Sequence, residues 1–126
     1  MIPAMADPRH ALGSAAEAAV GAWLEACGWR IVERRVRSTA GGEVDLVAID
    51  PGAVMVAIEV RARSSRRAGA AGVSVDARRV GRLRRTLVAR AAASGAAHVG
   101  LRVDLVTVEP AGSGGAWRLQ RLPGIG

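Results

Sequence analysis

Acidic residues inside two apolar segments could hold a divalent metal ion. Glu43 and Asp45 lie in the first segment, and Glu59 lies in the second, two residues before Arg61. Carboxylates within apolar strands are costly to bury unless they pair with a cation or bind one. Two carboxylates beside a cationic side chain can hold a hard cation and stabilise a phosphate. These residue types therefore point to metal-assisted chemistry on a phosphate ester.

A β-hairpin would bring the acids together. Residues 43–50 and 53–63 are rich in β-branched side chains and flank the turn-forming pair Pro51-Gly52. Because successive side chains of a strand point to opposite faces, Asp45 on the first strand and Glu59 on the second can share a face. If the hairpin pairs so that these faces coincide, Asp45, Glu59 and Arg61 converge.

Some of these residues have a purely structural interpretation, which the sequence leaves open. Asp45 and Glu59 could form internal ion pairs with Arg61 or Arg63 instead of binding metal. Asp104 is a single acid in the middle of another predicted strand, and we expect it to pair with an arginine.

Two segments have the period of an amphipathic helix, residues 9–27 and 74–93. Gly28 suits the end of the first, and Ser74 or Asp76 can cap the start of the second. The apolar stripe of the first comprises Leu12, Ala16, Ala19, Trp23 and Cys27; that of the second comprises Val80, Leu83, Leu87 and Ala91.

The remaining regular segments have the alternation or β-branched content of strands: residues 29–37, 98–109 and 116–122, beside the hairpin. Turns or loops are expected at residues 38–42, 64–72 and 111–115. The order is helix, three strands, helix, strand and a short edge strand. It predicts an α/β fold with a mixed sheet of four to five strands flanked by two helices.

Composition limits the class of protein. The 126 residues suit a single domain (1–126), with a loose lead-in at 1–8 and a partly flexible segment at 110–126. Phe and Tyr are absent, so the core must use Val, Leu, Ile and Ala, with Trp29 and Trp117 as packing residues.

A single cysteine, Cys27, excludes an intrachain disulfide and a Cys-based zinc site, and we expect it to be buried. Without a signal-peptide or transmembrane pattern, we expect a cytoplasmic protein and no membrane partner.

The charge favours a polyanionic partner. The formal net charge is +7, and all 18 basic residues are arginines. An excess of this kind favours nucleic acid, with an affinity that falls as salt rises. A solvated helix face is the alternative for the arginines of the second helix. The nucleic-acid-binding candidates are Arg63, Arg66 and Arg67 in the loop and Arg78, Arg82 and Arg85 on the helix.

The combined pattern resembles a known family. An acidic helix residue, Gly-Glu-Val-Asp at 42–45 and Glu-Val-Arg at 59–61 look like the YraN-like family of bacterial proteins. The resemblance runs from about Leu12 to Val108. That family belongs to the restriction-endonuclease-like nucleases, whose signature is an Asp followed by Glu-x-Lys, and is similar to archaeal Holliday-junction resolvases. The resemblance implies a restriction-endonuclease-like core, Mg²⁺-dependent hydrolysis of DNA, branched or damaged DNA among the substrates, and a homodimer.

The resemblance also implies roles for particular residues. Asp45 and Glu59 would be the principal metal ligands, with the carbonyl of Val60 as a third and Glu17 of the first helix completing the shell. Glu17, Asp45, Glu59 and Arg61 would be the catalytic residues, with Glu43 as a secondary acid. The metal would be Mg²⁺ or Mn²⁺, since every candidate ligand is an oxygen.

The chain departs from the family pattern at its basic positions. Arg61 and Arg79 stand where the family has lysines, Arg35 replaces a usual Asn, and Ala16 replaces a usual Gly. A lysine can be tuned to give up its proton, whereas an arginine effectively cannot. A non-catalytic nucleic-acid-binding module of the same fold is therefore the alternative function. A small structural or interaction protein is a third interpretation.

Overall fold

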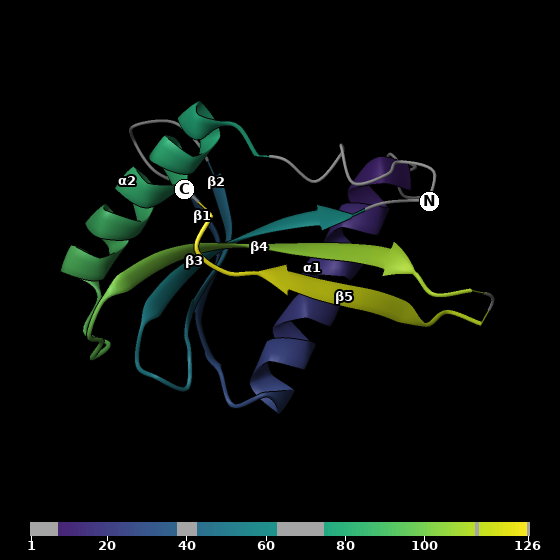
Figure 1. Cartoon of the computed structure of the whole chain (residues 1–126), viewed down its shortest axis with the longest axis horizontal. Coiled ribbons are helices and arrows are strands. Elements are labelled where there is room, and N and C mark those ends of the chain that lie inside the picture. The colour runs from purple at the N-terminus through teal and green to yellow at the C-terminus, as the bar shows by residue number, and fades with distance from the viewer. Residues whose placement is uncertain (1–7, 38–42, 63–74, 113, 126) are drawn as a thin grey trace, which may run out of the picture.

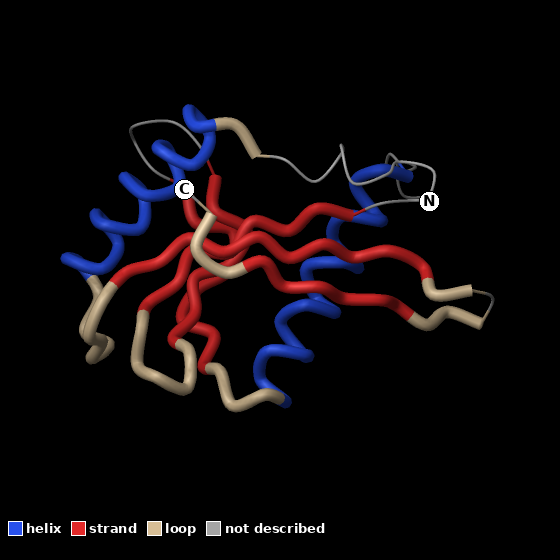
Figure 2. Tube along the Cα trace, viewed as in Figure 1, coloured by secondary structure: helices blue, strands red, loops and turns tan. Residues whose placement is uncertain are grey.

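A five-stranded mixed sheet with one helix on each face forms the domain, as the computed structural model shows (Figures 1 and 2). The structure describes residues 8–37, 43–62, 75–112 and 114–125. The elements in chain order are α1 (Pro8–Ala26), β1 (Arg30–Arg37), β2 (Glu43–Ile49), β3 (Met55–Ala62), α2 (Ala77–Ala93), β4 (Leu101–Pro110) and β5 (Trp117–Leu122). The predicted α/β class and the mixed sheet with two helices are confirmed, in agreement with a restriction-endonuclease-like core.

The strands lie side by side in the order in which they occur in the chain, β1-β2-β3-β4-β5. The pairs β1–β2, β2–β3 and β4–β5 are antiparallel, whereas β3 and β4 are parallel. A parallel pair needs a crossover connection, and α2 supplies it between β3 and β4. This connection places the first turn of α2 near the end of β3, close to the predicted acidic residues.

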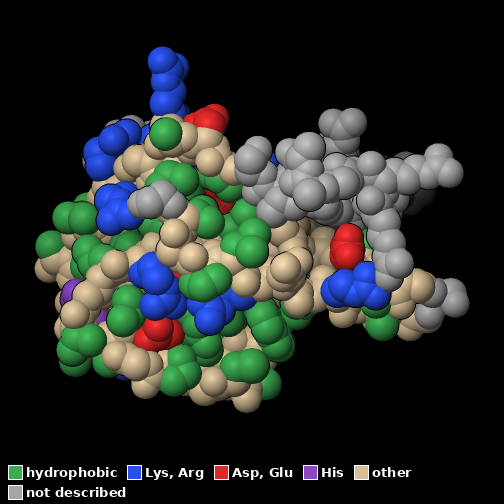
Figure 3. All heavy atoms as spheres, viewed as in Figure 1, with side chains coloured by type: hydrophobic (Ala, Val, Ile, Leu, Met, Phe, Trp, Pro, Cys, Tyr) green, Lys and Arg blue, Asp and Glu red, His purple; other side chains and the backbone are tan. Residues whose placement is uncertain are grey.

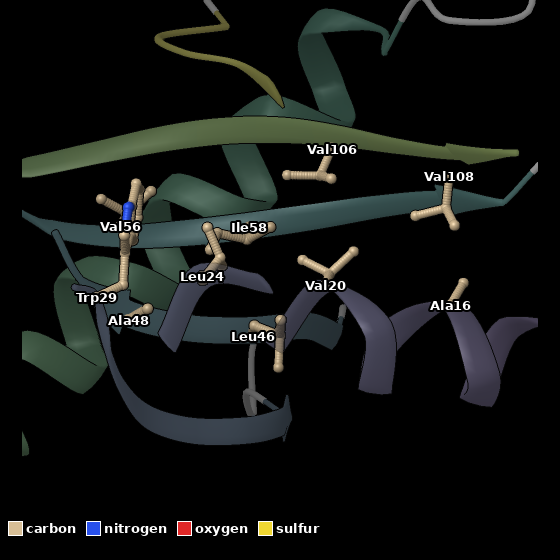
Figure 4. Close-up of a cluster of buried hydrophobic side chains, with 10 residues drawn as sticks. All are labelled: Ala16, Val20, Leu24, Trp29, Leu46, Ala48, Val56, Ile58, Val106 and Val108. Carbon is tan, nitrogen blue, oxygen red and sulfur yellow. The ribbon is translucent and has the colours of Figure 1, made fainter. Parts of the chain in front are cut away.

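Helix α1 packs on one face of the sheet through small and branched side chains. Its predicted stripe was only partly right: Ala16 is buried and Trp23 partly buried, but the other buried positions are Val20 and Leu24. Ala16, Val20 and Leu24 are buried against apolar residues of β2, β3 and β4, and Figure 4 shows this cluster together with Trp29. The helix ends at Ala26, and Gly28 follows with a φ of +89°, which suits a residue without Cβ. The amides of Gly28 and Trp29 then bond to carbonyls of the last turn.

Helix α2 covers the opposite face. Its buried residues Leu83 and Leu87 pack against a second apolar cluster that includes Val47, Met55 and Val103 of the strands. The predicted cap Asp76 is confirmed, since its carboxylate accepts a hydrogen bond of 2.8 Å from the amide of Arg79; Ser74, the other candidate, lies outside the described residues. The apolar stripe predicted for this helix is thereby confirmed at its centre.

The predicted hairpin between β2 and β3 is confirmed. Asp50 closes the turn, because its carboxylate accepts hydrogen bonds from the amides of Gly52 and Val54 at 2.8 and 3.0 Å. The strands pair from Ile49 opposite Met55 up to Leu46 opposite Ile58. This register decides which side chains meet at the open end.

Three predictions about local structure were wrong. Cys27 is exposed, not buried, because it belongs to the cap that ends α1 after the last buried residue, Leu24. The alternation of residues 29–37 would place Ile31 and Glu33 on one face, but a register shift between them breaks it. Ile31 packs toward the α1 cluster, whereas Glu33 bonds to α2. The fourth strand begins at Leu101 and not at residue 98.

Both tryptophans expected to pack do so: Trp29 lies in the core, and Trp117 packs partly against the same cluster.

In the described part of the chain, neither helix is long and apolar enough to cross a membrane.

Candidate acidic centre and basic face

The acidic centre lies where the β2–β3 ladder stops. Leu46 opposite Ile58 is the last paired position, and one step further the same register sets Asp45 opposite Glu59. There the amide of Val60 donates a hydrogen bond of 2.8 Å to Oδ2 of Asp45. A side chain thus takes the place of a backbone acceptor at the point where the strands separate. The predicted convergence of Asp45 and Glu59 is therefore found.

Glu59 is a buried carboxylate held by an arginine of the other layer. Its side chain is only 5% exposed, and Arg79 at the start of α2 contacts both of its oxygens. Nε of Arg79 donates to Oε2 at 3.0 Å, and Nη2 donates to Oε1 at 3.1 Å. Arg61 is a second cation, with Nε 3.8 Å from Oε1. Such a bidentate pair is the strong form of a charge-assisted hydrogen bond.

The environment of Asp45 disfavours its charged form. Burial raises the pKa of Asp45 to about 7, and the negative charges of Glu59 and Glu17 act in the same direction. The hydrogen bond from Val60 and the charge of Arg79 oppose this shift without cancelling it. A cation placed beside Asp45 would relieve both the burial cost and the repulsion between carboxylates.

Glu17 reaches toward this centre from α1 but has a partner of its own. Its Oε2 accepts a hydrogen bond of 3.2 Å from Nε of Arg35, whose Nη2 also donates to Oγ of Ser14 at 2.7 Å. Arg35 adopts a positive φ of 51° within β1. Glu43 lies at the start of β2 and is half-exposed, with its carboxylate 3.7 Å from Arg37.

The donor set fits a hard divalent cation in its chemistry. Asp45, Glu59 and the carbonyl of Val60 offer only oxygens, as Mg²⁺ and Mn²⁺ prefer. The set is not assembled as a ligand shell, because no three His, Cys, Asp or Glu side chains in the described residues are grouped to hold a metal ion. Both oxygens of Glu59 contact Arg79, so Glu59 would have to change partner to become a ligand.

A basic face runs along α2 beside the acidic centre. Arg78 and Arg85 are exposed, as predicted for positions opposite the apolar stripe, whereas Arg82 is half-buried at the edge of that stripe. Basic side chains gather over the end of the molecule occupied by α2 (Figure 3). Arg82 and Arg79 line one small hollow together with Glu43, Leu83 and Thr86. The other predicted nucleic-acid contacts, Arg63, Arg66 and Arg67, lie outside the described residues.

A second charged cluster on β4 has a structural role. The carboxylate of Asp104 is fully buried and accepts hydrogen bonds from Arg102, from Arg121 and from the amide of Gly124, at distances of 2.7 to 3.1 Å. Both guanidinium groups also lie over the ring of Trp29, at 6.0 and 5.3 Å from its centroid. The expected pairing of Asp104 with arginine is confirmed, and the cluster ties the C-terminal segment to the sheet.

Comparison with known proteins identifies the family. Residues 16–108 match the family model described as "Uncharacterised protein family UPF0102", which covers the later part of α1, all of α2 and most of the sheet. The chain belongs to UPF0102. This confirms the YraN-like resemblance seen in the sequence, and the matched stretch includes Glu17, Asp45, Glu59 and Arg79.

Similar UPF0102 proteins occur in diverse bacteria. One from Beutenbergia cavernae is 42% identical over 119 residues, covering 94% of this chain and 98% of its own length. One from Symbiobacterium thermophilum is 41% identical and covers 82% of this chain and 86% of its own. One from Deinococcus radiodurans is 36% identical and covers 89% of this chain and 91% of its own length. The similarity therefore extends over nearly whole proteins.

In this UPF0102 member, sequence reasoning missed the partner of Glu59. Arg61 and Arg63 were the expected partners, but the dominant contact comes from Arg79. A signal was present, because Arg79 lies four residues before the buried Leu83 and so falls beside the apolar stripe of the helix. Ser14, which contacts Arg35, had no signal of this kind, since its partner depends on an unusual backbone conformation.

Proposed function

We propose that this protein is a nuclease-like DNA-binding protein whose acidic centre supports Mg²⁺-dependent hydrolysis of phosphodiesters. The observation that carries the proposal is the pairing of Asp45 and Glu59 at the open end of the hairpin, where burial and like charge raise the pKa of Asp45 to about 7. Structural ion pairs alone would lower the pKa of such a carboxyl, whereas a carboxyl destabilised by neighbouring acids favours a cation.

The residues around the centre fit a phosphate substrate. Bound at Asp45 and Glu59, Mg²⁺ would lower the pKa of a coordinated water and offset charge on the scissile phosphate. Arg61 is exposed beside Glu59 and would contact that phosphate, since its planar guanidinium is suited to bidentate phosphate recognition. Arg78, Arg82 and Arg85 would hold the flanking backbone, which supplies affinity without sequence preference. Branched or damaged DNA is the substrate class proposed.

Cleavage of labelled duplex and branched DNA tests this proposal. Wild-type protein should cleave in Mg²⁺ and not in EDTA, and Asp45→Ala should abolish cleavage while its circular dichroism spectrum is unchanged. Glu25→Ala is the matched control, because it removes an exposed carboxylate of α1 whose pair with Arg34 spans 3.7 Å. Retained Mg²⁺-dependent cleavage by Asp45→Ala would refute the assignment.

A non-catalytic DNA-binding module is the second candidate, and a specific observation favours it. Two arginines, Arg61 and Arg79, contact Glu59, and neither can act as a base at neutral pH. Under this alternative, salt-sensitive DNA binding persists in EDTA, and Arg61→Lys does not confer cleavage. Cleavage gained by Arg61→Lys would instead show that the centre is intact apart from this one substitution.

A further inference from the structure

Arg79 links the acidic centre to the basic face. Its guanidinium donates to both oxygens of Glu59, and Nη2 also lies 3.5 Å from the carbonyl of Glu43. The side chain is nevertheless 28% exposed, against 5% for Glu59. The carboxylate is therefore enclosed, while its partner remains accessible from the side of α2.

A phosphodiester presents Arg79 with the same geometry as a carboxylate. Both anions accept two parallel N–H bonds from a guanidinium fork, so one can replace the other. Within the described residues, Arg79 is the bidentate partner of Glu59, and Arg61 makes only a longer contact of 3.8 Å. A phosphate that drew Arg79 away would leave Glu59 with a weakened partner.

Arg82 can bring a phosphate to this position. It lies three residues after Arg79, close to one helical turn, and the two line a small hollow together with Glu43, Leu83 and Thr86. The hollow is too small to hold a water molecule, so a phosphate would contact the two guanidinium groups from outside it. Among the described residues no acid forms a close ion pair with Arg82, although its charge, after the hydrogen bond from the amide of Arg79, helps to lower the pKa of Asp76, so its guanidinium can still accept an incoming anion. Two guanidinium groups of the same helix face would then share one backbone phosphate.

We infer that Arg79 is an exchangeable partner of Glu59: a DNA backbone phosphate bound by Arg79 and Arg82 releases Glu59 to bind a divalent cation. Arg79 is thus a positioning residue that couples substrate binding to metal binding. The inference rests on the proposed function, since it takes Asp45 and Glu59 as the cation site. This exchange explains why the oxygen donors suit a divalent cation but, among the described residues, are not grouped as a ligand shell while Arg79 holds Glu59.

This coupling has a thermodynamic signature. If DNA raises the affinity for Mg²⁺ by some factor, Mg²⁺ must raise the affinity for DNA by the same factor. We expect a factor of about ten, within the usual range for coupled sites. Simple screening by Mg²⁺ acts in the opposite direction, because it competes for the phosphates and weakens binding.

The test measures the affinity of a fluorescently labelled DNA duplex by anisotropy, with Mg²⁺ and with EDTA at the same ionic strength. Four proteins are compared: wild type, Arg79→Gln, Arg90→Gln and Asp45→Ala. Arg90 is the matched control, because it lies on the same helix and holds Glu33 by an equally bidentate contact at 2.6 to 3.0 Å. Mg²⁺-induced shifts in Tm without DNA are recorded for the same proteins.

The expected result is tighter DNA binding in Mg²⁺ for wild type and Arg90→Gln, and no difference for Arg79→Gln. Without DNA, Mg²⁺ should raise the Tm of Arg79→Gln more than that of wild type, because Glu59 is already released.

Equal Mg²⁺ dependence of DNA binding in wild type and Arg79→Gln would overturn the exchange but not the metal centre. Equal dependence in wild type and Asp45→Ala, or none in any protein, would overturn the metal centre itself. Should Arg79→Gln fail to fold, the comparison of wild type with Asp45→Ala still decides whether DNA and metal are coupled at this centre.

Discussion

Arg79 and Glu59 join helix α2 to the sheet at a buried acidic residue. The guanidinium of Arg79, at the start of α2, contacts both carboxylate oxygens of Glu59, on the central strand β3. Charge pairing of this kind stabilises the fold only while both partners are present, since a lone buried charge is costly. The same contact occupies both oxygens that Glu59 would offer to the proposed cation.

Glu59→Gln should lower the free energy of unfolding by about 2 kcal/mol, because it removes the counterion of a partly enclosed guanidinium. Glu33→Gln, which disrupts the more exposed pair with Arg90, should cost less than about 1 kcal/mol. Urea unfolding in EDTA measures both values. An equal decrease in the free energy of unfolding for the two variants would show that burial of the Arg79–Glu59 pair adds nothing to its contribution to stability.

Asp45 should make the protein less stable as pH rises. Its folded pKa of about 7 lies above the ordinary value of 3.8, so between these values the native state binds more protons than the unfolded state. Stability therefore falls from about pH 4 to about pH 7 and levels off above, by about 2 to 4 kcal/mol in total. The stability of Asp45→Asn should lack this pH dependence, because the amide side chain does not titrate. Its oxygen can still accept the hydrogen bond from the amide of Val60. Urea unfolding across this pH range in EDTA provides the measurement, and identical profiles for the two proteins would contradict it.

Asp104→Ala should be the most destabilising single substitution of a charged residue. It leaves Arg102, Arg121 and the amide of Gly124 without their shared acceptor, and we expect a loss of about 3 to 5 kcal/mol. Glu109→Ala is the control, since its pair with the exposed Arg118 should contribute less than about 1 kcal/mol. A small loss for Asp104→Ala would mean that the cluster does not hold the C-terminal segment.

Removing the charges of the basic face should reduce the salt dependence of DNA binding. Each phosphate contact contributes about −0.9 to the slope of log K against log salt, so replacing Arg78, Arg82 and Arg85 together by Gln should lower its magnitude by about 2 to 3. Arg118→Gln on β5 is the control and should leave the slope unchanged. A slope unaffected by the triple variant would place the DNA elsewhere on the surface.

The sequence was sufficient to predict the elements and the hairpin because their signals are local. Alternation, helical period and a Pro-Gly turn each act over a few residues, and all appear in the structure near the expected bounds. The meeting of Asp45 and Glu59 also followed from local information, since a tight hairpin fixes the register of its own strands. The irregular β1 could not be read in this way, because its register shift and the positive φ of Arg35 depend on contacts with both layers.

The partners of the charged residues depended on tertiary structure. Glu59 has Arg61 near it in sequence, yet its bidentate partner arrives 20 residues later on a crossover helix. Asp104 combines a neighbour on its own strand, Arg102, with Arg121 on the next. Sequence spacing predicts that a buried acid needs a cation, but the packing of helix on sheet decides which one.

Calorimetric titration of Mg²⁺ and Mn²⁺ into wild-type protein and Asp45→Ala tests the central claim most directly. At about pH 8, above the pKa of Asp45, the carboxylate is ionised and free to bind a cation. The account predicts saturable binding at one site in the wild type, weak while Arg79 holds Glu59, and no binding in Asp45→Ala. Equal binding by the two proteins, or none by either, would contradict a metal centre at Asp45 and Glu59.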